Sequence, residues 1–285
     1  MDGHPPLPPA RAVELAGRGR ARVYDTGGPG RPLLLLHGWT STAALNWYPT
    51  FPALADAGYR VVALDQRGHG HGIRSRLPFR LEACADDAAA LVELLGAGPV
   101  TAVGYSMGGP VAQLLWRRHP QVVGELVLCA TAASFPWGGQ MHRTVGSIGL
   151  GASVAFTLLP SAVRRGGMNL AIRRRQESAA WVLDEWRSHD LAALVQAGVA
   201  LSRFDSTRWI GGVDVPTAVV LTERDQTVPP ARQRDLAALV PGSLCFPVDG
   251  DHRVCVDEPE MFLPALLDAV AAVRREYSMP QCPAT

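Results

Sequence analysis

The stretch VTAVGYSMGG, residues 100–109, decides the fold of this chain. Its first four residues form an apolar run that is typical of a strand buried on both faces of a sheet. Ser106 then lies between Gly104 and Gly108, and a helical pattern continues to residue 119. The stretch is therefore either a plain glycine turn or a sharp turn from strand to helix that exposes a serine hydroxyl.

The second interpretation makes Ser106 a candidate nucleophile. A turn this sharp strains the serine backbone and crowds the positions two residues before and after it, where only very small residues fit. Gly104 and Gly108 satisfy that requirement. The helix that follows directs its first N–H groups toward a negative charge developing on oxygen. This context favours a nucleophile over a chance G-x-S-x-G in a chain with 29 glycines.

Apolar runs alternate with helical patterns on both sides of this turn. The runs predict strands, buried on both faces of a sheet, at residues 33–36, 60–64, 100–103, 125–130, 217–221 and 244–248. Residues 12–28 predict an antiparallel hairpin. Helices are predicted at residues 81–96, 107–119 and 259–277. Strands in alternation with helices predict the α/β class with a mostly parallel sheet.

The alternation breaks where a helical, tryptophan-bearing segment begins. We therefore expect one core in two parts, residues 1–133 and 209–285, with a helical cap at residues 134–208. Residues 144–160 are apolar and rich in small side chains, which suits either a wall for an apolar acyl or ring group or the cap's own packing. Residues 161–175 carry five arginines and no acid, which favours a solvated helix face over a site for an anionic ligand or membrane surface.

Composition narrows the class of protein. The chain has 285 residues, of which 47% are hydrophobic and 19% charged, as in globular domains. Its net charge of +1 gives no reason to expect a nucleic-acid partner. The five cysteines form no CxxC pair, and the N-terminus lacks a signal-peptide pattern, so we expect free thiols and a cytoplasmic location. Glycine, serine and proline interrupt the longest uncharged stretch, so no integral membrane segment is expected.

Around GYSMG, residues 104–108, the chain resembles the α/β-hydrolase superfamily, and the resemblance extends over nearly its whole length. It implies an α/β-hydrolase fold and a catalytic triad in the order Ser, Asp or Glu, His. The segment LLLLHGWT places His37 and Gly38 just after a strand. The resemblance implies that the backbone N–H groups of Trp39 and Met107 form an oxyanion hole. Gly38 has no side chain, so the backbone there can approach the substrate closely. The alternative is an ordinary turn glycine beside a packed His37.

The resemblance also supplies the acid. Residues 215–229, VPTAVVLTERDQTVP, are similar to the family's G-x-x-D-x-x-V-P motif, with Thr222 in place of the glycine. Asp225 is favoured over Glu223 because it aligns with the Val-Pro that follows. Its role would be to orient the base and stabilise the imidazolium. The alternative is a solvated carboxylate in a loop.

The base is implied to be His252, which lies in VDGDHRVCVDEPEMF, residues 248–262. Asp251 departs from the family pattern by adding a charge beside it. The segment LDQRGHGHG, residues 64–72, resembles another loop of the family. It contains His69 and His71, whose HxH spacing also occurs among metal ligands. Because no further ligand follows at a suitable spacing, we favour a tight loop fixed by its Asp and Arg residues, and we expect no metal.

These residues together imply a serine hydrolase. We expect it to cleave carboxylic ester-type bonds of a small, largely apolar substrate through an acyl-enzyme, without metal or organic cofactor. A C–C bond or lactone hydrolase, an acyltransferase or a cofactor-free perhydrolase would use the same triad. A non-catalytic ligand-binding protein of this fold is a separate alternative. Dehalogenase and epoxide hydrolase chemistry is disfavoured, because those family members have Asp where this chain has Ser106.

Overall fold

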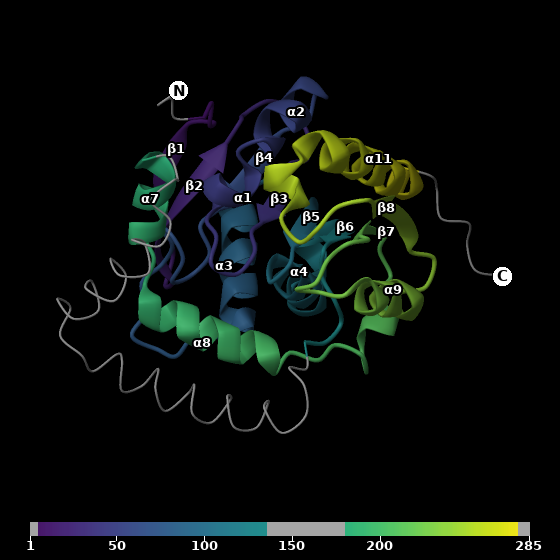
Figure 1. Ribbon diagram of the computed structural model, residues 1–285. Coiled ribbons are helices and arrows are strands. Elements are labelled where there is room, and N and C mark those ends of the chain that lie inside the picture. Colours follow the sequence, from purple (N-terminus) through teal and green to yellow (C-terminus); the bar gives the residue numbers. More distant parts are fainter. Residues whose placement is uncertain (1–4, 136–179, 279–285) are drawn as a thin grey trace.

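The computed structural model describes residues 5–135 and 180–278, and these residues fold around one eight-stranded sheet (Figure 1). Its strands are β1 (Ala10–Leu15), β2 (Gly19–Asp25), β3 (Leu33–Leu36), β4 (Val61–Leu64), β5 (Val100–Tyr105), β6 (Val123–Cys129), β7 (Thr217–Thr222) and β8 (Leu244–Val248). They lie in the order β1-β2-β4-β3-β5-β6-β7-β8. The first hairpin and the β2–β4 pair are antiparallel, and the remaining pairs are parallel.

The strand predictions are confirmed. Each predicted run overlaps a strand, and the predicted hairpin overlaps the β1–β2 pair. One expectation needs correction: β8 is not buried on both faces, because Cys245 and Pro247 are exposed and only Val248 is fully buried. It is the last strand of the sheet, so only one of its edges has a neighbour. The parallel order places the carboxyl ends of β3 to β8 at one edge, where ligand sites of open α/β sheets form.

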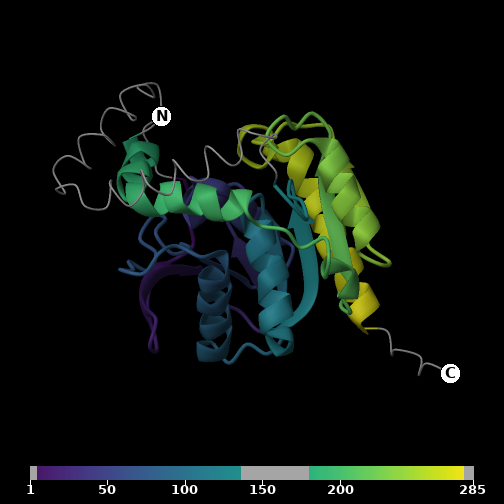
Figure 2. The ribbon, with the colours of Figure 1, turned by 90° about the horizontal axis from the view of Figure 1, so that it is seen from below.

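Helices cover both faces of this sheet, as the view from below shows (Figure 2). They are α1 (Ala43–Trp47), α2 (Thr50–Asp56), α3 (Leu81–Leu94), α4 (Gly108–Arg118), α7 (Ala180–Arg187), α8 (Leu191–Ser202), α9 (Pro230–Leu239), α10 (Val254–Asp257) and α11 (Pro259–Ser278). Side chains of β3 alternate between two apolar clusters. Leu34 and Leu36 join the cluster of α3 and α4, whereas Leu33 and Leu35 join that of α2 and α11. The sheet is thereby the middle layer of three.

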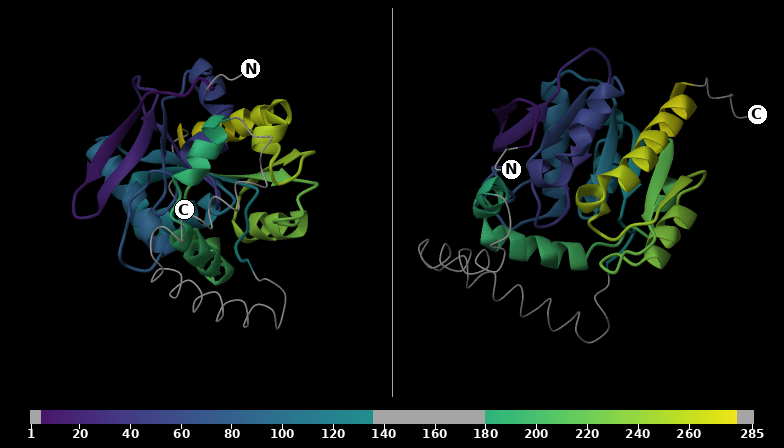
Figure 3. Two further views of the ribbon diagram at one scale, coloured as in Figure 1. Left: turned by 60° about the vertical axis from the view of Figure 1, so that its left-hand side comes forward. Right: turned by 45° about the horizontal axis from the view of Figure 1, so that its top comes forward.

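The insertion between β6 and β7 is helical where the structure describes it, in α7 and α8 (Figure 3). The apolar stretch 144–160 and the arginine-rich stretch 161–175 lie outside the described residues. Ala193 of α8 packs so close to Gly68 that a Cβ on the glycine would lie 2.2 Å from the alanine Cβ. α8 therefore lies against the loop that follows β4. The division of the chain into a core and a cap at residues 134–208 stays a prediction.

Across residues 5–135 and 180–278, no helix combines the length and the apolar character needed to cross a membrane.

Candidate active site

Ser106 occupies a strained turn between β5 and α4. Its φ is +52°, a left-handed value that is uncommon for a residue with a side chain. A Cβ on Gly104 would lie 2.4 Å from the Gly108 carbonyl oxygen, and one on Gly108 would lie 2.0 Å from the Leu36 carbonyl oxygen. Neither contact is sterically possible, so both positions require glycine. The Thr131 hydroxyl donates to the Ser106 carbonyl at 2.8 Å and helps to hold the turn.

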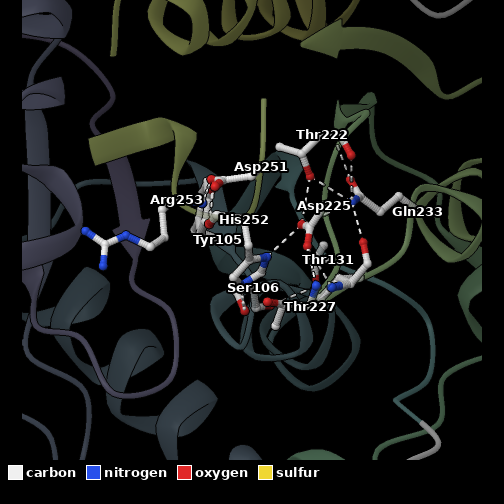
Figure 4. A network of polar contacts seen from close by, with 11 residues as sticks. Tyr105, Ser106, Thr131, Thr222, Asp225, Thr227, Gln233, Asp251, His252 and Arg253 are labelled. Carbon is white, nitrogen blue, oxygen red and sulfur yellow. Dashed lines mark hydrogen bonds and ion pairs between the residues drawn. The ribbon is translucent and has the colours of Figure 1, made fainter. Parts of the chain in front are cut away.

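Three residues from distant parts of the chain converge at this turn (Figure 4). The Ser106 Oγ lies 2.9 Å from Nε2 of His252, and Nδ1 of the same ring lies 2.6 Å from Oδ2 of Asp225. Because Asp225 can only accept a hydrogen bond when it is ionised, Nδ1 carries the proton and Nε2 is free to accept one. The imidazole can therefore take a proton from the serine hydroxyl while the carboxylate stabilises the resulting positive charge.

The carboxylate of Asp225 is buried, with 3% of the residue exposed. Its Oδ1 accepts hydrogen bonds from the backbone N–H groups of Thr227 and Val228, both at 2.8 Å. Glu223, the competing acid, instead pairs with Arg234 of α9. The structure thus brings Asp225 to the histidine and directs Glu223 away from it.

Met107 and the turn before Trp39, which carry the proposed oxyanion hole, are both next to Ser106. Met107 is the N-cap residue of α4, so its N–H belongs to the first helical amides, which have no partner within the helix. Gly38 lies against the serine, because a Cβ on it would be 3.4 Å from the Ser106 Cβ. Its own N–H donates to Asn46 Oδ1 at 2.8 Å, which fixes the turn before Trp39.

His37 supports this turn through both of its ring nitrogens. It is fully buried, its Nδ1 lies 2.8 Å from the Gly38 carbonyl, and its Nε2 accepts from the Gln66 N–H at 2.9 Å. Both ring nitrogens are therefore occupied by backbone groups. Burial lowers the pKa of His37 well below its ordinary value, and the nearby His69 adds to this. A neutral His37 thus links the turn after β3 to the loop after β4.

That second loop is built as the sequence predicted, around its acid and its arginine. Asp65 accepts from the backbone N–H groups of Ala43 and His71, both at 2.9 Å. Arg67 forms an ion pair with Asp87 of α3. His69 is buried, and its Nδ1 faces the Arg67 carbonyl at 3.0 Å. Within the described ranges, no three His, Cys, Asp or Glu residues are arranged to hold a metal ion.

Sequence reasoning missed several residues around the site. Asn46 holds the Gly38 turn, Gln66 donates to the His37 carbonyl at 2.5 Å, and Gln233 contacts the loop of Asp225. Gln66 lies inside the LDQRGHGHG motif, residues 64–72, and this position is the one signal in the sequence that points to it. No spacing in the sequence connects Asn46 or Gln233 with the triad, because these contacts exist only in the folded chain.

Residues 31–259 match a protein family described as having the alpha/beta hydrolase fold. A non-heme haloperoxidase from Rhodococcus erythropolis is 29% identical over 237 residues, which are 78% of this chain and 85% of that protein. A poly(3-hydroxyalkanoate) depolymerase from Ectopseudomonas oleovorans is 26% identical over 96% of this chain and 97% of its own. The structure of a thermophilic esterase from Thermogutta terrifontis superposes with a TM-score of 0.68 at 25% identity, covering 93% of this chain and 99% of that one. Because the family match covers most of the chain and the sheet is mostly parallel with helices on both faces, this chain belongs to the α/β-hydrolase family.

Proposed function

We propose that this protein hydrolyses carboxylic esters of small, largely apolar acyl compounds through a covalent acyl-enzyme on Ser106. The observation that carries the proposal is the unbroken line of contacts from the Ser106 Oγ through His252 to Asp225, at 2.9 and 2.6 Å. A serine hydroxyl is a weak nucleophile until an adjacent base removes its proton, and this line supplies the base and the group that orients it.

In the first half-reaction, the Ser106 oxygen attacks the ester carbonyl carbon as its proton moves to Nε2 of His252. The carbonyl oxygen becomes an oxyanion, which accepts hydrogen bonds from the backbone N–H groups of Trp39 and Met107. When the tetrahedral species collapses, the bond to the leaving oxygen breaks and His252 returns its proton to the alcohol. Asp225 remains ionised and holds the imidazolium throughout.

In the second half-reaction, water replaces the alcohol. His252 takes a proton from the water while the water oxygen attacks the acyl carbon, and the oxyanion again forms beside Met107. Collapse of this second tetrahedral species breaks the bond to Ser106 and releases the carboxylic acid. The imidazole returns its proton to the Ser106 oxygen, so the enzyme emerges unchanged and only water and ester are consumed.

Two kinds of similarity support ester chemistry over the other reactions of this triad. The family and the relatives support a hydrolase, and one relative is named for depolymerising poly(3-hydroxyalkanoate), a polymer whose units are ester-linked. The esterase similar in structure points the same way. We further propose that the insertion at residues 134–208 roofs the substrate site, because α8 lies against the loops after β3 and β4.

A second candidate is transfer of the acyl group to hydrogen peroxide. The relative named a non-heme haloperoxidase favours it. Hydrogen peroxide would take the place of water in the second half-reaction, so that its oxygen attacks the acyl carbon and a peracid leaves. The same nucleophile, base and oxyanion donors serve both reactions, and only the acceptor differs.

The proposal is tested by labelling with a fluorophosphonate probe and by turnover of p-nitrophenyl esters of graded acyl length. We expect the probe to react with Ser106, as mapped by mass spectrometry. Ser106→Ala should lose labelling and keep only a weak rate above water, because binding and the oxyanion hole leave a residual acceleration on the order of a thousandfold or more. Ser243→Ala is the matched control, since Ser243 donates to the Ala237 carbonyl in the turn before β8.

Absence of labelling at Ser106 in folded protein that still hydrolyses esters would contradict the assignment of the nucleophile. Absence of both labelling and turnover would contradict the enzymatic function and favour a ligand-binding protein. Addition of hydrogen peroxide with acetate, followed by measurement of peracid, separates the second candidate from simple hydrolysis.

A further inference from the structure

Two fully buried polar side chains, Thr222 and Gln233, contact Asp225 (Figure 4). Thr222 is the last residue of β7, and Gln233 lies on α9. The Thr222 Oγ1 lies 2.9 Å from Asp225 Oδ2, which is the same oxygen that faces Nδ1 of His252 at 2.6 Å. The two residues therefore reach the carboxylate oxygen that the proposed mechanism uses.

The surrounding contacts fix the orientation of the Gln233 amide. Its Oε1 accepts from the Thr222 backbone N–H at 3.0 Å, a group that can only donate. Its Nε2 donates to the Val228 carbonyl at 2.7 Å, a group that can only accept. A flipped amide would place donor against donor and acceptor against acceptor. Only one orientation of the side chain is therefore compatible with its neighbours.

This orientation also fixes the direction of the Thr222 hydroxyl. Gln233 Nε2 donates to Thr222 Oγ1 at 2.8 Å, so the hydroxyl accepts on that side. Its single hydrogen is left for its other polar neighbour, Asp225 Oδ2. The result is a directed chain in which Gln233 donates to Thr222 and Thr222 donates to the carboxylate. A glycine at position 222, as in the motif that this segment resembles, supplies no such donor.

We propose that Thr222 and Gln233 are positioning residues of the triad, which hold Asp225 Oδ2 on the line to His252. The proposal rests on the proposed function for its catalytic consequence. Two backbone N–H groups already hold the other oxygen, Oδ1. Without Thr222, the contacts of Oδ2 that remain among the described residues are His252 itself and Gln233 Nε2 at 3.4 Å, beyond the usual hydrogen-bond distance. The threonine hydroxyl is thus the second firm point that fixes rotation of the carboxylate.

The test compares Thr222→Val, which keeps the shape and removes the hydroxyl, with Thr222→Ser, which restores it. Thr217→Val is the matched control, because Thr217 is a buried threonine on the same strand whose hydroxyl donates to the Val215 carbonyl, away from the triad. For hydrolysis of p-nitrophenyl acetate, we expect Thr222→Val to lower kcat about tenfold or more with little change in KM, because hydrogen bonds to charged groups are among the stronger ones. Thr222→Ser and Thr217→Val should keep the wild-type kcat.

A spectroscopic measurement tests the same contact without turnover. The His252 Nδ1–H proton, assigned by its loss in His252→Gln, should give a low-field ¹H NMR resonance. In Thr222→Val it should move upfield, because a carboxylate oxygen that rotates off the line to His252 forms a longer and weaker hydrogen bond with Nδ1–H. On the loop of His252, Arg253 pairs with Asp257 and its backbone N–H donates to Asp251, and Thr222 takes part in neither contact.

The outcomes separate this inference from the proposed function. Unchanged kcat and an unchanged resonance in folded Thr222→Val overturn the positioning role, as does an equal loss in Thr217→Val. A resonance that responds to Thr222 in a protein without ester turnover supports the positioning role and overturns the proposed function alone. If Thr222→Val fails to fold, Thr222→Ala removes the same hydroxyl with less steric demand, and the same readings apply.

Discussion

The indole N–H of Trp39 donates a hydrogen bond to the Leu194 carbonyl of α8, with 2.8 Å between Nε1 and the oxygen. This contact joins the turn after β3, whose backbone is proposed to bind the oxyanion, to a helix of the insertion. The ring lies against Gly198 one turn further along α8, where a Cβ would come within 2.7 Å of the indole Cζ2. The absence of a side chain at Gly198 therefore lets the indole pack against the helix.

Gly198→Ala should displace the Trp39 indole. An alanine within a helix is ordinarily more stable than glycine by roughly 1 kcal/mol, but overpacking a filled contact costs about 1–3 kcal/mol. We expect a lower Tm and a lower kcat/KM for short esters, because the Trp39 N–H moves with its side chain. Circular dichroism melting and ester kinetics measure the two effects.

Gly212→Ala is the control for this substitution, since no atom of the described residues, apart from its own chain neighbours, lies within 4 Å of a Cβ built on Gly212. It should change neither Tm nor kcat/KM appreciably. If Gly198→Ala behaves like Gly212→Ala, then the contact between the indole and α8 does not position the turn.

Asp225→Asn should lower kcat by orders of magnitude and leave the fold intact. An amide at this position favours the wrong tautomer of His252, and amidation of a triad aspartate reduces kcat about ten-thousandfold in a well-studied protease. Glu223→Gln is the control, because Glu223 pairs with Arg234 at the surface and not with the histidine. Ester kinetics rank the two variants, and a larger loss in Glu223→Gln would mean that the acid is misassigned.

The sequence predicts the sheet well because a strand buried on both faces requires an unbroken apolar run. The runs at residues 33–36 and 217–221 leave little alternative, and both are strands. β8 is an edge strand and is partly exposed. Its apolar run at residues 244–248 therefore wrongly predicts burial on both faces. The short helices α1 and α2 were not predicted, because five to seven residues are too few to show a helical period.

The proposed site divides along a similar line. Ser106, Asp225 and His252 lie in local motifs, so the resemblance of those motifs to a known family suffices to select them. Thr222 was visible only as a departure from a motif, and Gln233 was not visible at all. The partners of Gln233 are Thr222, at the end of β7, and Val228, in the loop before α9, so the hydrogen bonds exist only after α9 packs on the sheet. Side-chain networks of this kind depend on tertiary contacts that no local pattern contains.

The buried Asp65 should make stability fall as pH rises. Burial raises the pKa of Asp65 from 3.8 to about 6, although backbone N–H groups of His71 and Ala43 oppose the shift. A folded pKa above the unfolded value contributes stability at low pH that is lost as pH rises through about 6. Relative to Asp65→Asn, the wild type should lose about 1 kcal/mol of unfolding free energy between pH 5 and 7. Urea denaturation at both pH values measures the difference, and a pH-independent difference would show that Asp65 stays ionised.

The buried His69 should have the opposite effect. Burial lowers its pKa from 6.5 to about 4, and its ring lies 5.3 Å from that of His37 and 5.7 Å from that of His189. A positive charge on the His69 imidazole would therefore have no contact with solvent and would lie beside two other imidazole rings. Because the folded pKa lies below the unfolded value, its contribution to stability is fully present above pH 6.5 and is lost as pH falls toward 4.

His69→Gln removes the titration and isolates this contribution. The difference in unfolding free energy between wild type and variant should shrink by about 2 kcal/mol when the pH is lowered from 7 to 5, because only the unfolded wild type gains a proton at this position. His71→Gln on the same loop is the control: burial also lowers the pKa of His71, but its exposed side chain should give a smaller change. Equal pH dependence for the two variants would mean that His69 reaches solvent in the folded protein, and the loop after β4 would then be more open than its packing against α8 implies.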